Sequence, residues 1–222
     1  GTGLPHDGFQ DRCIQPLCHS SVEASSIILP HVALFECREE PMSVEKDGAM
    51  GQERETDVAA TDVAAVDETY MRMALAEAAL AAEEGEVPIG AVVVCDGEVV
   101  ARAHNRRETD LDPSAHAEFS AMVAASEALG RWRLSGCTVY VTLEPCLMCA
   151  GLMVNARIDR CVYGAADPKG GALGTLYDVS HDERLNHEFE VTAGVLADEA
   201  AEQLRSFFRA RRAALKKAKS QA

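Results

Sequence analysis

The sequence predicts an α/β layered domain, because strand-like and helix-like segments alternate along most of the chain. Two observations support this prediction. Short β-branched runs such as Ile89–Cys95 and Cys137–Leu143 are typical of buried strands, and longer stretches with helically spaced apolar residues lie between such runs. Glycine and proline residues stand at the boundaries between the two kinds of segment.

Residues 1–66 differ in composition from the rest of the chain. They show no sustained hydrophobic period and mix Gly, Pro, Ser and Glu, so we expect a largely disordered acidic N-terminal extension followed by one domain over residues 67–222. Two apolar patches of the extension, Ser26–Leu29 and Val32–Phe35, could pack on that domain. Five side chains could be imagined as a second metal site, but their spacing fits no zinc module: Cys13, Cys18, His19, His31 and Cys37.

The first elements of the domain are a helix and a hairpin. Tyr70–Ala82 has apolar residues at helical spacing, and Gly85 ends that pattern. A strand over Ile89–Cys95 follows, and Asp96-Gly97 is a strong two-residue hairpin turn that leads into a second strand over Glu98–His104.

Two further helices each start beside residues of chemical interest. Ser114–Leu129 has the pattern of a helix, with Ser114 as its N-cap and Gly130 at its end. A strand over Cys137–Leu143 precedes a helix that Pro145 opens and that extends to about Ala156. The remaining expected elements are a short strand, a glycine-rich loop, a last strand and one or two final helices: Asp159–Tyr163, Gly164–Gly174, Phe189–Thr192 and Leu196–Lys219.

Targeting signals and membrane spans are not evident in the sequence. No apolar run approaches the ~18 residues of a transmembrane helix, and the N-terminus lacks the pattern of a signal peptide. We therefore expect a cytoplasmic protein, in which closely spaced cysteines are better interpreted as a metal site than as a disulfide.

The distribution of charge matters more than its sum. A net charge of −15 argues against nucleic acid as a partner, but residues 1–66 hold 4 basic and 12 acidic side chains, a net of −8. The end of the chain carries +7, and no acidic residue follows Glu202. Local charge determines whether a phosphate backbone is attracted, although a solvated helix end would look the same. The cations are Arg205, Arg209, Arg211, Arg212, Lys216, Lys217 and Lys219.

One histidine and two cysteines form the strongest candidate site. His116 lies in a His-Ala-Glu sequence at the start of a helix, and Cys146 and Cys149 lie in Pro-Cys-Leu-Met-Cys at the start of another, with a strand between them. Two helix N-termini reached through one sheet can face each other. Zinc accepts imidazole nitrogen and thiolate sulfur, and three protein ligands leave a fourth position for water, which is typical of catalytic zinc.

Glu118 would lie beside the metal without binding it, because it is two residues from His116. It could take a proton from the zinc-activated water and later deliver it to a ring nitrogen and a departing amine. This combination is the signature by which zinc-dependent nucleobase deaminases are recognised, and the assignment rests on that signature. A purely structural zinc site, or a redox-active cysteine pair, would leave Glu118 and the missing fourth ligand unexplained.

At these residues the sequence resembles the cytidine deaminase superfamily, and within it the bacterial tRNA-specific adenosine deaminases. The resemblance extends from about Tyr70 to Arg212, and residues 1–66 contain no segment that matches the family. Five segments carry it: Val87–Val92, Pro113–Glu118, Thr142–Gly151, Asn186-His187 and Phe207–Arg209. It implies a three-layer α/β/α cytidine-deaminase-like fold with a five-stranded mixed sheet, one Zn²⁺ per subunit and a homodimer. It also implies deamination of adenosine to inosine at the wobble position of a tRNA anticodon, usually that of an arginine tRNA.

The resemblance also implies roles for individual residues, each with a structural alternative. Asn105 would hydrogen-bond the flipped base or be only a turn residue, and Ala117 would offer its backbone amide. The pocket walls, which any core could also use, would be Ile89, Leu143 and Pro145. Asp167 and Lys169 would lie near the RNA backbone or in a solvated turn. Phe207 and Phe208 would stack on RNA, with Arg209 beside them, or pack a helix. We expect Glu144 to orient its loop rather than react.

Two other functions stay open at this point. The same scaffold serves free-base and nucleotide deaminases that act on guanine or cytosine. An RNA-binding scaffold with an inactive site is the non-enzymatic alternative, and the intact set of His116, Glu118, Cys146 and Cys149 argues against it.

Overall fold

A computed structural model describes residues 52–221 of the chain, with side-chain surroundings from residue 62 to residue 221. The five strands form one mixed sheet in the order β2-β1-β3-β4-β5, which confirms the predicted fold class. The elements are α1 (Gln52–Glu83), β1 (Gly90–Cys95), β2 (Glu98–His104), α2 (Ala117–Ala128), β3 (Cys137–Leu143), α3 (Leu147–Ala156), β4 (Arg160–Ala165), β5 (Glu190–Ala193) and α4 (Ala197–Gln221).

The strands pair antiparallel in one half of the sheet and parallel in the other. β1 is antiparallel to both β2 and β3, whereas β3, β4 and β5 run parallel. The β1–β2 hairpin turns at Asp96 and Gly97, which have φ values of 51° and 78°. Positive φ at both turn residues is the conformation that the Asp-Gly pair was expected to supply.

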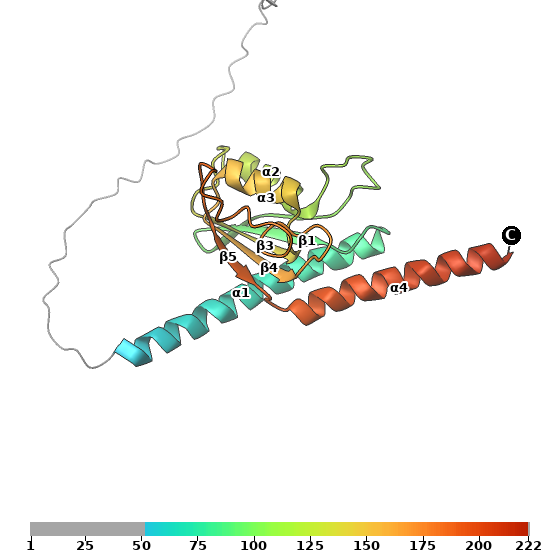
Figure 1. Cartoon of the computed structure of the whole chain (residues 1–222), viewed down its shortest axis with the longest axis horizontal. Helices are drawn as coiled ribbons and strands as arrows, with labels where there is room; N and C mark the ends of the chain where they lie inside the picture. Colours follow the sequence, from blue (N-terminus) through green and yellow to red (C-terminus); the bar gives the residue numbers. More distant parts are fainter. Residues whose placement is uncertain (1–51, 222) are drawn as a thin grey trace, which may run out of the picture. The chain divides into compact units, whose positions relative to one another are not determined.

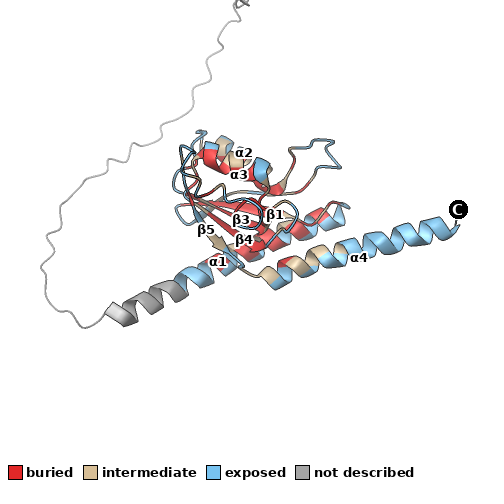
Figure 2. Ribbon diagram, in the orientation of Figure 1, coloured by how far each residue is buried: buried red, intermediate tan, exposed pale blue. Residues whose placement is uncertain are grey.

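Helices cover both faces of the sheet and complete three layers (Figure 1). Along β3, Val139 and Val141 pack into the cluster beneath α2 and α3, while Tyr140 packs into the cluster beneath α1 and α4. This alternation follows from the two-residue period of a strand. Buried residues accordingly lie in the sheet and on the inner sides of the helices, and the later part of α4 is exposed (Figure 2).

Helix α1 approaches the sheet closely and is tied to it by a buried ion pair. A Cβ at Gly90 would lie 2.1 Å from the Ala74 carbonyl oxygen, so only glycine allows this approach. Asp67, 3 % exposed, accepts hydrogen bonds from the Arg160 guanidinium at 2.9 and 2.6 Å and from the Tyr140 hydroxyl at 2.9 Å. The carboxylate therefore has partners for its buried charge and joins α1 to β3 and β4.

Several element boundaries differ from the sequence-based prediction. Helix α1 begins at Gln52, so residues 52–66, expected in a disordered extension, are helical; their alanines and glutamates are strong helix formers. Helix α2 begins at Ala117 after His116, so the prediction of Ser114 as its N-cap is wrong. Ser114 instead donates from its backbone N–H and its hydroxyl to Asp112, at 2.7 Å each. Helix α4 is one continuous helix.

Some expectations cannot be compared with the structure. The five Cys and His residues of the N-terminal extension whose spacing fits no zinc module, and the two apolar patches Ser26–Leu29 and Val32–Phe35, lie outside the described residues. Among the helices of residues 52–221, none combines the length and the apolar character that crossing a membrane requires.

Candidate active site

The N-caps of two helices supply the central side chains of the site. His116 caps α2 and Cys146 caps α3, both in extended backbone conformation, and neither side chain caps its own helix. Both helices lie on the same face of the sheet (Figure 1), so these two side chains can meet, and His116 Nδ1 lies 3.7 Å from Cys146 Sγ. Cys149, in the first turn of α3, is fully buried and faces the same point.

The three donor atoms have the spacing of a metal site. His116 Nδ1 lies 3.7 Å from Cys146 Sγ and 3.7 Å from Cys149 Sγ, and all three ligand atoms lie within 4.8 Å of one another. Tetrahedral zinc, with bonds of about 2.3 Å to sulfur and about 2.0 Å to nitrogen, separates such ligands by roughly 3.5 Å. The residues present therefore fit a zinc ion in donor chemistry and in spacing.

The thiols of Cys146 and Cys149 differ in pKa. The hydrogen bond from Cys149 lowers the pKa of Cys146 to about 3, with His116 assisting. The same hydrogen bond, together with burial, raises the pKa of Cys149. The two pKa shifts are opposite because two adjacent thiolates repel each other, so ionisation of one sulfur disfavours ionisation of the other. A divalent cation removes that repulsion and allows both sulfurs to ionise.

Glu118 stands apart from the three donor residues in its chemistry. It lies in the first turn of α2, is 4 % exposed, and burial raises its pKa. Its Oε2 is buried and has no hydrogen-bond partner among residues 62–221. A buried oxygen without a partner costs about 1–3 kcal/mol, more when charged. Glu118 Oε2 is therefore an acceptor that the described residues leave free.

The residues expected to contact the base lie at the start of β1, after β2, and before or at the start of α2 and α3. Asn105 is 5 % exposed and its backbone N–H donates to the Ile89 carbonyl at 2.9 Å. Ala117 opens α2, so its backbone N–H has no partner within the helix. Ile89 packs at the edge of the core, and the Pro145 carbonyl accepts from the backbone of Ala172 at 2.9 Å.

Glu144 holds the glycine-rich loop against the cysteine turn. Its carboxylate accepts the backbone N–H groups of Asp167, Leu173 and Thr175 at 3.0, 3.1 and 3.0 Å, and also the Thr175 hydroxyl. Gly171 lies so close that a Cβ there would be 2.3 Å from Glu144 Oε2. These contacts confirm the expectation that Glu144 orients the loop.

Four of the expected RNA contacts line one groove, and Phe207 is not among its lining residues. Asp167 and Lys169 of the loop and Phe208 and Arg209 of α4 line a hollow of about 750 Å³, together with Val87, Leu143, Arg205 and Arg212 among others. Phe208 is 39 % exposed and makes an edge contact with Phe207 at 5.4 Å. Local contacts are also present: Asp167 accepts the Lys169 backbone N–H at 2.9 Å, and Arg209 pairs with Glu202 at 2.8 Å.

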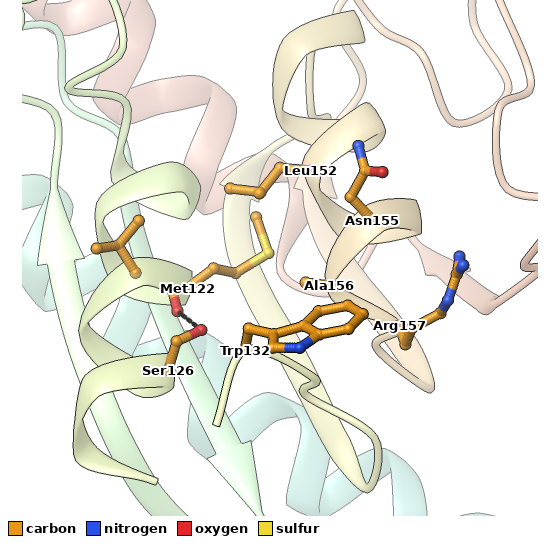
Figure 3. Close-up of a pocket in the computed structure, with 8 residues that line it drawn as sticks. Met122, Ser126, Trp132, Leu152, Asn155, Ala156 and Arg157 are labelled. Atoms are coloured by element: carbon orange, nitrogen blue, oxygen red, sulfur yellow. Dashed lines mark hydrogen bonds between the residues drawn. The ribbon is translucent and has the colours of Figure 1, made fainter. Parts of the chain in front are cut away.

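A smaller apolar hollow lies on the outer side of α2 and α3 (Figure 3). Its volume is about 320 Å³, and Met122, Leu152 and Trp132 form its walls. Trp132 is 61 % exposed, which is unusual for so large an apolar side chain.

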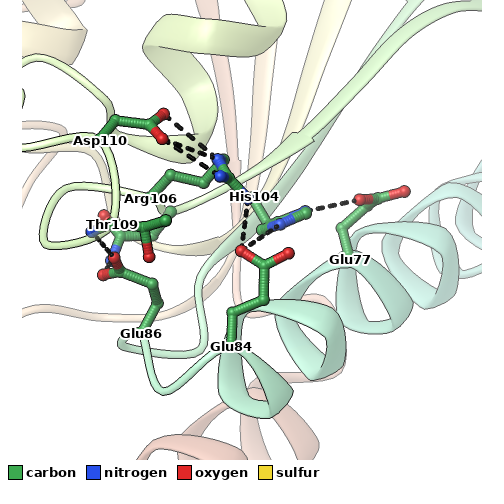
Figure 4. A network of polar contacts seen from close by, with 8 residues as sticks. Glu77, Glu84, Glu86, His104, Arg106, Thr109 and Asp110 are labelled. Carbon is green, nitrogen blue, oxygen red and sulfur yellow. Dashed lines mark hydrogen bonds and ion pairs between the residues drawn. The ribbon is translucent and has the colours of Figure 1, made fainter.

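Sequence reasoning missed Glu86, which lies between α1 and β1. Glu86 is 1 % exposed, and its Oε2 accepts from Asn105 Nδ2 at 3.0 Å. Its Oε1 accepts from the Thr109 backbone N–H at 2.6 Å, and Figure 4 shows these two residues side by side. Its polar surroundings in the sequence are typical of an exposed turn, so no local signal distinguished it.

Comparison with known proteins agrees with this geometry. Residues 65–212 match the family model of the MafB19-like deaminases. A tRNA-specific adenosine deaminase of Bacillus subtilis is 55 % identical over 143 residues, which cover 64 % of this chain and 89 % of that protein.

Two solved structures are also similar. One, from a study of A-to-I editing by tRNA:A34 deaminases at the wobble position of transfer RNA, is 48 % identical with a TM-score of 0.60 and covers 61 % of this chain and 99 % of its own. A guanine deaminase from Nitrosomonas europaea is 27 % identical with a TM-score of 0.52, covering 63 % and 83 %. The family model matches most of the chain, and the match to the Bacillus subtilis deaminase covers 89 % of that protein. The chain therefore belongs to the MafB19-like deaminase family, together with the tRNA-specific adenosine deaminases.

Proposed function

We propose that this protein converts adenosine to inosine at the wobble position of a tRNA anticodon, as a hydrolase acting on a carbon–nitrogen bond of a cyclic amidine. One observation carries the proposal: three converging metal ligands lie beside a buried carboxylate that lacks a partner, in the order and spacing of the deaminase signature. The relatives named for adenosine deamination of tRNA support the choice of substrate.

We propose His116, Cys146 and Cys149 as ligands of one Zn²⁺ per subunit. When bound, zinc supplies a Lewis acid that makes a water molecule more acidic at neutral pH. Three protein ligands leave a position open to solvent or substrate, as catalytic sites require. The helix N-termini at His116 and Cys146 add positive potential beside the thiolates.

Glu118 is the proton carrier in this proposal. Its partnerless Oε2 accepts one proton from the attacking water and delivers it to the ring nitrogen, and the same carboxylate then carries the second proton of that water to the departing amine. Water and adenosine are consumed, and inosine and ammonia are released, so the carboxylate ends in its starting state. Burial keeps its pKa above the ordinary value, which suits a group that must both accept and donate.

The base would be held by Asn105 and by the backbone N–H of Ala117, with Ile89 and Pro145 as apolar walls. The anticodon arm, of arginine tRNA by resemblance, would lie along the groove that Asp167, Lys169, Phe208 and Arg209 line. Arginine and lysine side chains attract phosphate, and an exposed aromatic ring can stack on an unpaired base. A free base would need no such groove.

A homodimer and a cytoplasmic location also belong to this proposal. The apolar hollow beside Trp132 is the surface that we assign to a second copy of the chain, because it lies on the outer face of the helices that carry the metal ligands (Figure 3). Sedimentation of the zinc-loaded protein at micromolar concentration tests this assignment, and a monomer mass would contradict it.

The deciding experiment is inosine formation by purified zinc-loaded protein on an anticodon stem-loop with a wobble adenosine. A stem-loop with that adenosine moved by one position is the matched control. Inosine in the first substrate alone supports the proposal. Ammonia release from free guanine or cytosine, without inosine in either stem-loop, would contradict it and favour the alternative that the guanine deaminase neighbour represents.

A further inference from the structure

We propose that Glu86 is a positioning residue, which fixes the orientation of the Asn105 side-chain amide and so determines the hydrogen-bonding group presented to the base. The proposal deepens the function given above and rests on it, since it takes Asn105 to contact the base. The side-chain hydrogen bonds of Glu86 go to Asn105 and Thr109 and not to the three candidate metal ligands.

The contacts around Glu86 are complete and buried. Its carboxylate is 1 % exposed, and each oxygen accepts one hydrogen bond, from Asn105 Nδ2 at 3.0 Å and from the Thr109 backbone N–H at 2.6 Å. Asn105 is itself 5 % exposed and its backbone N–H bonds the Ile89 carbonyl at 2.9 Å. The position of the Asn105 backbone is therefore set by the segment that leads into β1, and only the rotation of its amide is left to be decided.

The chemistry of the two groups decides that rotation. The two ends of an asparagine amide have nearly the same shape but opposite hydrogen-bonding character, and both oxygens of Glu86 act as acceptors. Glu86 therefore holds Nδ2 toward itself and turns Oδ1 away. Among residues 62–221, no donor to Asn105 Oδ1 is present, so this acceptor and the second amide hydrogen are left for a ligand.

The neighbouring acidic residue provides a contrast. Glu84 pairs with Arg106 and with His104 (Figure 4), and its side chain is more exposed at 39 %. Its carboxylate forms no hydrogen bond with Asn105, whose side-chain amide donates to Glu86. Removing its charge perturbs the same turn after α1 without acting on the amide. Glu84 is thus a matched control for Glu86.

The test is the Glu86→Gln variant. The Thr109 backbone N–H can only donate, so the oxygen of the introduced carboxamide must face it, and the carboxamide nitrogen then faces Asn105 and turns its amide over. A base group that met an acceptor now meets a donor, and kcat/KM for inosine formation should fall about 10- to 100-fold. Glu84→Gln should change kcat/KM by less than about 2-fold, as expected of an exposed charge. Zinc content and thermal unfolding verify that each variant folds.

A double-mutant cycle separates positioning from a general structural role. In an Asn105→Ala background, Glu86→Gln should cause no further loss, because the group through which it acts is gone. An equal loss in both backgrounds would overturn the proposal. If the wild-type protein deaminates only a free base, the same cycle is measured on that base, which tests Glu86 although the tRNA assignment has failed.

A spectroscopic readout needs no turnover. The Asn105 side-chain NH2 resonances, assigned by their loss in Asn105→Ala, should shift in Glu86→Gln and stay unchanged in Glu84→Gln. Unchanged resonances in Glu86→Gln would show that Glu86 does not orient the amide and would overturn the proposal whatever the substrate.

Discussion

At the scale of single residues, the buried carboxylate of Glu118 is the most informative group of the candidate site. Glu118 has a buried oxygen without a partner, while the equally buried Glu86 and Glu144 have a full set of donors. Burial of a carboxylate is tolerated when hydrogen bonds replace water. The exception therefore marks the point at which the site expects water and substrate.

Replacing Glu118 by Gln keeps the size of the side chain and removes its ability to accept a proton. Zinc should stay bound, since His116, Cys146 and Cys149 are untouched, and kcat should fall by about 10²- to 10⁴-fold. Metal analysis and single-turnover inosine formation measure the two effects. Glu127→Gln, an exposed change at the other end of α2, is the control. Turnover at the wild-type rate in Glu118→Gln would remove the assigned role.

At the scale of elements, the site depends on how two helix N-termini and one loop are held. The N-cap residues of α2 and α3 are the proposed ligands His116 and Cys146, neither of which caps its helix through its side chain, and the glycine-rich loop pairs with the cysteine turn through Gly171 and Cys146. Glu144 connects the two through its four hydrogen bonds. Although burial acts in the opposite direction, these bonds hold the pKa of Glu144 below its ordinary value.

This shift makes a prediction about stability in acid. Because the pKa of Glu144 is lower in the folded than in the unfolded state, the unfolded state binds more protons near pH 4, and the free energy of unfolding falls as pH decreases through that range. Glu144→Gln should flatten that fall and cost about 1–3 kcal/mol at neutral pH. Urea unfolding from neutral to acidic pH measures both effects. Glu98→Gln, at an exposed position, is the control. The prediction is contradicted if the free energy of unfolding of Glu144→Gln falls with decreasing pH as steeply as that of the wild type.

At the scale of the whole molecule, the candidate RNA groove exists only because two distant segments meet. The glycine-rich loop follows β4, whereas Phe208, Arg209 and Arg212 belong to α4 at the end of the chain. The later part of α4 is exposed, and its cations offset the negative charge of the molecule locally (Figure 2). A protein of net charge −15 can thus still attract a phosphate backbone along one surface.

Removing this charge should change the salt dependence of binding. Replacing Arg209, Arg211 and Arg212 by Ala should weaken binding of the anticodon stem-loop and reduce the slope of log K against log salt by about 1 to 3, one unit for each lost phosphate contact. Arg184→Ala, a remote exposed change, should leave the slope unaltered. Titrations at several salt concentrations measure the slope, and a slope unaltered in the triple variant would show that the tail does not contact phosphate.

The local elements and the central chemistry of this protein are encoded in short stretches of its sequence. The strands over Glu98–His104 and Cys137–Leu143 have the bounds that were predicted, because a buried strand is encoded in a continuous β-branched run or follows an Asp-Gly turn. The four residues His116, Glu118, Cys146 and Cys149 were proposed as a site from their motif and its spacing, and the fold brings the His116, Cys146 and Cys149 donor atoms together. That pattern is local, and each half of it stands at the start of one helix.

Which distant polar groups meet depends on the tertiary structure alone. Glu86 and Asn105 are far apart in the sequence, and each looks like an exposed turn residue until the fold brings them together in a buried place. The shared groove of Lys169 and Phe208 depends in the same way on the packing of α4 against the sheet. This difference arises because periodicity along the chain reports burial of one element at a time, whereas hydrogen bonds between elements depend on the arrangement of all of them.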